Sequence, residues 1–340
     1  MTKLSFKLLA PLLMILHIRS PAIGSSVFRP NSWCNKAQGL SDAQRRFCRN
    51  VPGLHIAIKT GIEEGLSECK REFMRSRWNC TLLGEKSLFA RLTDGTREAA
   101  FTTAMLSAAL AYKVALACIA KNVTECSCEK VEHSFRGESW KWTGCSVNVV
   151  FGSYTAARFM LSARSNNSQI DMMKIHNVRV GLEVLKENRV VKCKVGKRGN
   201  AKACLMTFPP LFKISRMIKS KYNNARNVIA IQRKNKQAFY LKASGPNRPN
   251  LKRPSKSELV FISQSPTYCY RQDKYRIPGT RGRKCHRNTH RGDDCVLMCC
   301  GRGYKRSVQH KERLCHCSRA ENEQCRCKVR THVVIENNCL

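Results

Sequence analysis

The pattern of apolar and polar positions predicts helices in the first two thirds of the chain. Over residues 53–78, apolar side chains recur at helical spacings and so share one face. The members of that face are Ile56, Ile62, Leu66, Cys69 and Phe73. Before this stretch, Asp42 is a suitable N-cap for a helix that continues through Arg45, Arg46 and Phe47.

Residues 97–121 form a second, more apolar helical stretch. It is rich in alanine and apolar almost all round, which is typical of a helix buried in a protein core. A membrane span is the alternative, but the uncharged run from Ala99 to Tyr112 has only 14 residues, whereas a span needs roughly 20. We therefore expect a core helix and no stable membrane insertion.

The N-terminus has the three parts of a secretory signal peptide. Lys3 supplies the charge, an apolar run extends from Leu8 to Ile18, and Ala22-Ile23-Gly24 supplies the small residues of a cleavage site. A buried N-terminal helix is the alternative interpretation. We predict a signal peptide over residues 1–24, and hence a protein secreted into the extracellular space or matrix.

Composition divides the rest of the chain into three regions. Residues 25–230 hold the helical patterns and should form a helical domain. Residues 231–262 are rich in Lys, Arg and Pro and should bury little apolar surface, so we expect a basic linker. Residues 263–340 hold ten of the 20 cysteines and should form a small domain of short strands, such as 331–337, joined by disulfides.

The 20 cysteines fit an oxidising compartment, where each bridge contributes roughly 2–4 kcal/mol by restricting the unfolded chain. Three N-x-S/T sequons fit it as well, and they make Asn79, Asn122 and Asn166 candidate glycosylation sites. Asn79 is the weakest of the three, because Cys80 lies inside its tripeptide and is itself a candidate for a bridge.

The formal net charge of +39 implies attraction to polyanions. Outside a cell these are sulfated glycosaminoglycans, and inside a cell they are nucleic acids. The sequence has no zinc-finger spacing, no aromatic RNA-binding stretch and no heptad zipper. We therefore expect heparan sulfate proteoglycans among the partners, and no nucleic acid.

No enzyme active site is evident. The chain lacks G-x-S-x-G, H-E-x-x-H and P-loop motifs, and its 23 acidic residues include no evident catalytic pair. A zinc site is conceivable at Cys315, Cys317, Cys325 and Cys327. However, C-x-C spacing places both side chains on one face of a strand, so two facing strands would form two stacked bridges, the interpretation we favour. We expect a protein that is not an enzyme and has no metal or other cofactor.

Three longer motifs resemble one family. ECKREFMRSRWNC (68–80) resembles the E-C-x-x-Q-F-x-x-R-R-W-N-C segment of Wnt proteins, and WKWTGCSVNVVFG (140–152) resembles their W-x-W-G-G-C-S-D-N-x-x-F-G segment. CCGRGY (299–304) matches a third Wnt motif. Shorter likenesses lie at 47–50, 97–101 and 265–269. The chain thus resembles the Wnt family from about Trp33 to its C-terminus.

The resemblance implies a fold and a set of disulfides. The fold is a mainly α N-terminal domain, saposin-like and carrying β-hairpins, followed by a linker and a small disulfide-rich β domain of cystine-knot-like form. Family order implies eight pairs: Cys34–Cys48, Cys69–Cys80, Cys118–Cys126, Cys128–Cys145, Cys193–Cys204, Cys269–Cys300, Cys285–Cys295 and Cys299–Cys339. Two more bridges are expected among the four C-x-C cysteines, with their pairing left open.

The predicted hairpin at 190–208 departs from the family pattern. Wnt proteins usually carry C-K-C-H-G-x-S-G-S-C-x-x-K-T-C-W here, and the Ser of G-x-S-G receives a palmitoleoyl chain that inserts into a Frizzled receptor. Cys193 and Cys204 correspond to the outer cysteines, and Val195 replaces the first inner one. Residues 194–203 include no Ser or Thr, so the acylated residue has no counterpart. The candidate receptor contacts of this loop are basic: Lys194, Lys197, Arg198 and Lys202.

The last domain departs from the family at a second receptor contact. Wnt proteins usually have F-x-W-C-C-x-V-x-C at the tip of a long hairpin, whereas this chain has AENEQC at 320–325. Polar residues therefore replace an apolar tip. The candidate contacts there are Glu321, Asn322 and Glu323.

Three functions follow as alternatives. The first is a secreted Wnt-like signalling ligand for Frizzled-family receptors, not palmitoleoylated, with a low-density-lipoprotein-receptor-related protein as a candidate co-receptor. In lacking the serine it resembles the divergent insect branch typified by the Wnt inhibitor of Dorsal. The second is a non-activating decoy or matrix-bound antagonist with a Wnt fold. The third is a saposin-like lipid-binding module, suggested by the helical, disulfide-linked first half.

Overall fold

The computed structural model describes most of the chain beyond its N-terminus. The described residues are 32–80, 92, 94–129, 145–163, 168–195, 202–232, 239–243, 253–273, 277–289, 291–319 and 325–340. For some strand residues among them, including 313–319 and 325–330, only the backbone is described. The predicted signal peptide and Asn166 lie outside these ranges.

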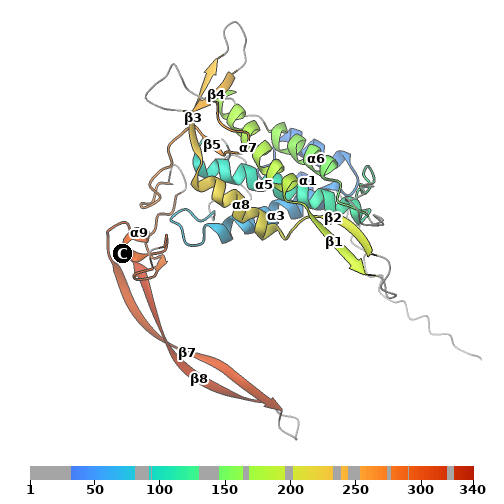
Figure 1. Ribbon diagram of the computed structural model, residues 1–340. Coiled ribbons are helices and arrows are strands. Elements are labelled where there is room, and N and C mark those ends of the chain that lie inside the picture. Colours follow the sequence, from blue (N-terminus) through green and yellow to red (C-terminus); the bar gives the residue numbers. More distant parts are fainter. Residues whose placement is uncertain are drawn as a thin grey trace, which may run out of the picture.

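Helices predominate among the described residues up to Asn223 (Figure 1). They are α1 (Ser32–Lys36), α2 (Asp42–Asn50), α3 (Leu54–Glu72), α5 (Arg97–Ile119), α6 (Val149–Ser162), α7 (Ser168–Glu187) and α8 (Leu211–Asn223). The short α9 (Cys295–Met298) lies in the C-terminal part. The helical region and the disulfide-rich strands that follow it agree with the predicted fold class.

The central helix is α5, which packs against α3, α6, α7 and α8 (Figure 1). Within the described part of the chain it is the one helix whose length and composition would suit a membrane span, and 72% of its most apolar window is buried in the protein. Its neighbours approach closely through glycines. A Cβ on Gly181 would lie 2.1 Å from the Ala104 carbonyl oxygen, and one on Gly152 would lie 2.6 Å from that of Ala111. The predicted core helix is thus confirmed.

The predicted start of α2 is wrong by one residue. Ser41, not Asp42, is the N-cap, because its hydroxyl accepts a hydrogen bond from the Gln44 backbone N–H at 3.2 Å. The Gln44 side chain in turn accepts from the Ser41 N–H at 3.0 Å, which completes a capping box. Asp42 is the first helical residue, where its negative charge suits the positive end of the helix dipole.

The predicted apolar face of α3 is partly wrong. Ile62, Cys69 and Phe73 are buried, but Ile56 is 53% exposed. The face turned to the core passes instead through Ile58 and the two glycines that approach α5, Gly61 and Gly65. The close approach of the α3 and α5 backbones sets the orientation of α3. The spacing of apolar residues in the sequence does not predict such an approach.

In the described part of the chain, strands form three sheets. An antiparallel hairpin joins β1 (Val190–Val195) to β2 (Lys202–Thr207). β3 (Arg226–Gln232) pairs antiparallel with β4 (Phe239–Ala243) and parallel with β5 (Val260–Phe261). In the third sheet the order is β6 (Lys284–Cys285), β8 (Cys325–Cys339) and β7 (Tyr304–Arg319).

Two expectations about the last third of the chain are corrected. Leu241, Val260 and Phe261 lie in the predicted linker, 231–262, yet they are buried in one small core with Val228. They bury because β4 and β5 both pair with β3. In the C-terminal part, residues 331–337 belong not to a short strand but to β8, which is 15 residues long. The proposed domain boundaries themselves stay a prediction.

A buried carboxylate ties the helices to the segment that leads into the C-terminal part. Glu98, near the start of α5, accepts hydrogen bonds from Tyr222 Oη at 2.9 Å and Ser265 Oγ at 2.5 Å. Burial and this carboxylate raise the pKa of both Tyr222 and Tyr268, so both phenols stay protonated. Residues 265–268 are thereby held against the helices by polar contacts.

Lys174 of α7 generates a test of pH dependence. It is 3% exposed, and its Nζ donates to the Ala163 carbonyl oxygen at 2.5 Å. Burial lowers its pKa from 10.5 to about 8. Between about pH 8 and pH 10.5 Lys174 binds more protons in the unfolded chain than in the folded one. Its contribution therefore makes the free energy of unfolding rise with pH, and this rise ends near pH 10.5.

The measurement is chemical denaturation of Lys174→Met and wild type between pH 7.5 and 10. We expect the variant to show a weaker rise, although Lys219, with its pKa also lowered to about 8, keeps part of it. Lys213→Met, at an exposed position, is the control and should follow the wild type. An unchanged pH slope in Lys174→Met would contradict the assignment.

Candidate functional site

Two hairpins project from the molecule in different directions (Figure 1). One is β1–β2, which carries the predicted loop with no hydroxyl. The other is β7–β8, called the ribbon below, which extends from the C-terminal part. They are the candidate functional surfaces because both predicted sets of receptor contacts fall on them.

The β1–β2 hairpin is closed by a disulfide at directly opposite positions. Cys193 and Cys204 are cross-strand partners with Cα atoms 4.0 Å apart. The base of β2 is tied to the helical part, because Val147 N–H donates to the Met206 carbonyl and Met206 N–H donates to Ser146 Oγ, each at 3.0 Å. The base of the hairpin is therefore fixed by both covalent and polar contacts.

The predicted contacts of this hairpin are only partly located. Lys194 lies opposite Ala203 in the register, and Lys202 lies opposite Val195. Their side chains, together with Lys197 and Arg198, lie outside the described residues. As receptor contacts these four residues therefore stay predictions.

The ribbon pairs β7 with β8 from Tyr304↔Cys339 out to Arg319↔Cys325. The register places Cys317 opposite Cys327, after a bulge between Cys315 and Cys317. The two C-x-C segments meet only at this position, because Cys325 lies opposite Arg319 and Cys315 lies opposite Lys328. The four side chains lie outside the described residues, as do Glu321, Asn322 and Glu323. The choice between bridges and zinc at these cysteines stays a prediction.

One face of the ribbon carries an exposed apolar strip that the sequence analysis did not identify. Val308 lies opposite Ile335, and Val333 is two positions along β8 on the same face. All three are at least half exposed. The alternation of apolar and polar residues in 331–337 could have predicted this strip. A two-stranded ribbon has no core to cover its apolar face, so that face is exposed.

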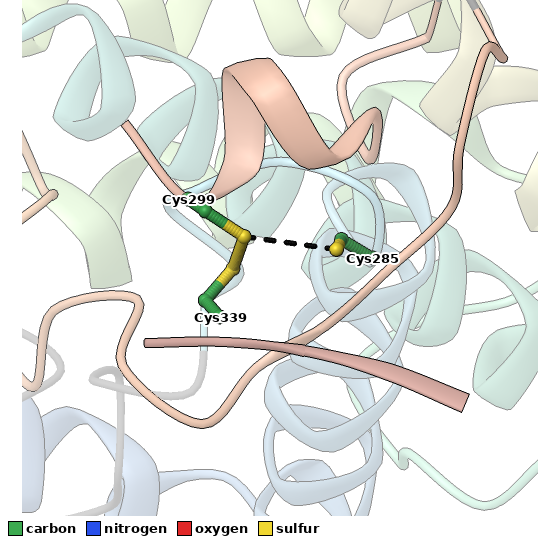
Figure 2. A group of neighbouring side chains, drawn as sticks. All are labelled: Cys285, Cys299 and Cys339. Carbon is green, nitrogen blue, oxygen red and sulfur yellow. Dashed lines mark hydrogen bonds between the residues drawn. A yellow bond between two sulfur atoms is a disulfide. The ribbon is translucent and has the colours of Figure 1, made fainter. Parts of the chain in front are cut away.

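A cluster of cysteines lies at the base of the ribbon (Figure 2). The sulfur atoms of Cys285, Cys299 and Cys339 lie within 4.8 Å of one another, the spacing of a metal site. Figure 2 shows the Cys299–Cys339 bridge beside Cys285, with the Cys299 and Cys285 sulfurs 3.6 Å apart. Cys285 is itself bonded to Cys295. Because the ligand of a metal is the thiolate, these bonded sulfurs form two stacked bridges and no metal site.

Eight disulfides are present among the described residues, and they coincide with the pairs that the resemblance implies. They are Cys34–Cys48, Cys69–Cys80, Cys118–Cys126, Cys128–Cys145, Cys193–Cys204, Cys269–Cys300, Cys285–Cys295 and Cys299–Cys339. Of the described sequons, Asn122 is exposed and Asn79 is partly buried. Cys80, inside the Asn79 sequon, is bonded to Cys69.

A cleft of about 700 Å³ lies between α6, α7 and the segment at 256–257. Val149, Ser153 and Leu182 are among the residues that line it, and so is His176, whose Nε2 lies 2.8 Å from the Glu258 carbonyl oxygen. Burial lowers the pKa of His176, so its ring stays neutral near pH 7. The charged residues that line the cleft have both signs: Arg179, Lys186, Lys256, Glu183 and Glu187. None of the predicted site residues lies there.

Removing the Cys193–Cys204 bridge tests whether the hairpin is an independently stabilised element. In Cys193→Ala/Cys204→Ala, the closed loop with a separation of 11 residues is lost, which lowers local stability by about 3 kcal/mol. We expect faster hydrogen exchange of the amides in 191–206, with the unfolding midpoint of the helices nearly unchanged.

The matched control is Cys34→Ala/Cys48→Ala, because that bridge lies in the main core. It should lower the global free energy of unfolding by roughly 2–5 kcal/mol. Wild-type exchange rates in the hairpin variant would show that strand pairing alone maintains β1–β2.

Comparison with known proteins identifies the family. Residues 36–340 match the Wnt family. Protein Wnt-2 of Drosophila melanogaster is 35% identical over 347 residues, which cover 97% of this chain and 94% of that protein. The structure of human WLS in complex with WNT8A matches with a TM-score of 0.57 and 26% identity, over 84% of this chain and 93% of that chain.

A further match is the crystal structure of the Drosophila WntD N-terminal domain and linker. It has a TM-score of 0.43 and 19% identity, over 64% of this chain and 98% of that chain. The match over residues 36–340 and the 35% identity to Wnt-2 are decisive. This chain belongs to the Wnt family, whose members are secreted, disulfide-rich, non-enzymatic signalling ligands of development.

Proposed function

We propose that this chain is a signalling ligand for a Frizzled-type receptor that acts without a palmitoleoyl chain. One observation carries the proposal. The hairpin that bears the acylated serine in the family is present and closed by Cys193–Cys204, yet residues 194–203 include no hydroxyl side chain. Oxygen acylation of this loop therefore has no acceptor.

The energetic consequence is large. Each buried methylene of an acyl chain contributes about 0.8 kcal/mol, so a long chain can supply much of the affinity of a ligand. Without it, binding depends on protein surface. The apolar strip of Val308, Val333 and Ile335 offers burial, and the basic loop offers electrostatic contacts, which salt weakens.

The absence of the lipid would also affect how the protein is secreted and how far it diffuses. An unacylated ligand would leave the cell without the acyltransferase and without a lipid-dependent carrier. Its net charge of +39 would retain it on heparan sulfate in the extracellular matrix. We also propose a low-density-lipoprotein-receptor-related protein as the co-receptor. We further propose that the chain belongs to the branch typified by the Wnt inhibitor of Dorsal.

Metabolic labelling tests the absence of the lipid. Cells that secrete this chain are fed an alkynyl fatty acid, and the purified mature protein is coupled to a reporter dye. We expect no label, whereas a Wnt protein that carries the acylated serine, expressed in the same cells, should be labelled. Dye covalently attached to the mature chain would overturn the proposal.

Binding to Frizzled ectodomains tests the receptor. We expect measurable binding at physiological salt that weakens as salt rises, because charge replaces part of the lipid contact. Neutralising the loop in Lys197→Gln/Arg198→Gln should weaken binding several-fold. Lys36→Gln/Lys70→Gln, which removes the same charge from exposed helical positions, should not.

The same experiment separates the alternatives. Binding accompanied by a reporter response supports an agonist, and binding with no response supports the decoy. If no Frizzled ectodomain binds, the receptor proposal fails. Native mass spectrometry of the secreted protein addresses the saposin-like alternative, and we expect no co-purified lipid.

A further inference from the structure

The loop after α3 is a rigid platform. The Cys69–Cys80 bridge joins its end to the last turn of α3. Inside it, Phe73 is buried and meets Trp78 and Phe101 edge to face, with ring centroids 4.6 and 4.9 Å apart. A covalent clamp and an aromatic cluster thus fix the backbone of residues 73–80 against α5.

Arg283, from the C-terminal part, contacts the backbone of this loop. Its Nη1 donates to the carbonyl oxygens of Ser76 at 2.8 Å and Arg77 at 2.6 Å, and its Nη2 lies 3.4 Å from that of Met74. Burial lowers the pKa of the guanidinium from its ordinary value. A planar fork of donors suits several fixed carbonyls, which a lysine ammonium matches less well.

Further contacts flank Arg283. Arg75 Nε lies 3.4 Å from Oδ2 of the buried Asp293, and Arg77 Nη1 lies 3.5 Å from the Cys269 sulfur. At Gly292 the two backbones nearly touch, since a Cβ there would lie 2.7 Å from the Arg75 carbonyl oxygen. The platform and the C-terminal part are therefore closely fitted across several points.

Arg283 is also built into the base of the ribbon. Its own carbonyl accepts a hydrogen bond from the Cys339 N–H at 2.9 Å. The next residue, Lys284, pairs with Asn338 of β8. Cys339 is in turn bridged to Cys299. One residue thus joins the fixed platform on the helical side to the last residues of β8.

We propose that Arg283 is a positioning residue that sets the direction of the ribbon relative to the helical part. A strand of 15 residues is about 50 Å long at the usual rise. A rotation of about 10° at the base would therefore move the far end by about 9 Å, beyond what a receptor interface tolerates. Its importance for receptor binding rests on the proposed function, but its control of direction does not.

The experiment compares three variants of the full secreted chain. Arg283→Ala removes the fork, Arg283→Lys keeps the charge without it, and Arg281→Ala changes an exposed arginine two residues away. Small-angle X-ray scattering and amide hydrogen exchange report on shape and on the platform. Circular dichroism verifies that the helices are intact.

We expect Arg283→Ala and Arg283→Lys to broaden the distribution of interatomic distances and to speed exchange in 74–78, while Arg281→Ala matches the wild type. Affinity for a Frizzled ectodomain should fall by about tenfold in the first two, since a preoriented ribbon is lost. Wild-type scattering from both Arg283 variants would overturn the proposal.

Two outcomes need separate readings. If Arg283→Ala is not secreted, Arg283→Lys, which keeps the charge but not the fork, is measured alone, and wild-type scattering from it overturns the proposal. If the wild type binds no Frizzled ectodomain, the receptor proposal fails, while scattering still decides whether Arg283 directs the ribbon.

Discussion

The close approach of neighbouring backbones to α5 is the constraint on which the helical part depends. Gly61, Gly152 and Gly181 come from three different helices, and each leaves no room for a Cβ against α5 without a shift. Alanine and serine on α5 allow this contact from several sides. The orientation of α3, the placement of α7 and the support beneath β1–β2 all follow from it.

The C-terminal part is stabilised by different means. Its small core is Cys285, Cys295, Met298, Cys299 and Cys339, mostly bridged cysteines. This core buries too little apolar surface to fix the C-terminal part against the helical part. Disulfides therefore maintain its shape, and polar contacts set its orientation relative to the helices. Glu98 secures the segment that enters it, and Arg283 secures the base of the ribbon.

This division fits the proposed function, in which two distant hairpins contact a receptor. In that proposal the chain has no lipid and relies on protein surface, whose contacts weaken when geometry shifts. A rigid platform and a fixed ribbon are therefore of greater value to it, and the exposed strip of Val308, Val333 and Ile335 is useful only if it is well oriented.

The sequence by itself determined the central helix, the disulfide-rich end and the absence of Ser and Thr from 194–203, because composition, periodicity and residue identity are local properties. Motif order also implied the bridges that the structure shares. Only the tertiary structure decided that Ile56 faces solvent, that Leu241 and Phe261 are buried, and that β8 runs for 15 residues. The meeting of Arg283 with Ser76 in the loop after α3 likewise joins residues 207 positions apart. All these outcomes depend on which backbones approach one another in the folded chain, and local patterns do not encode that.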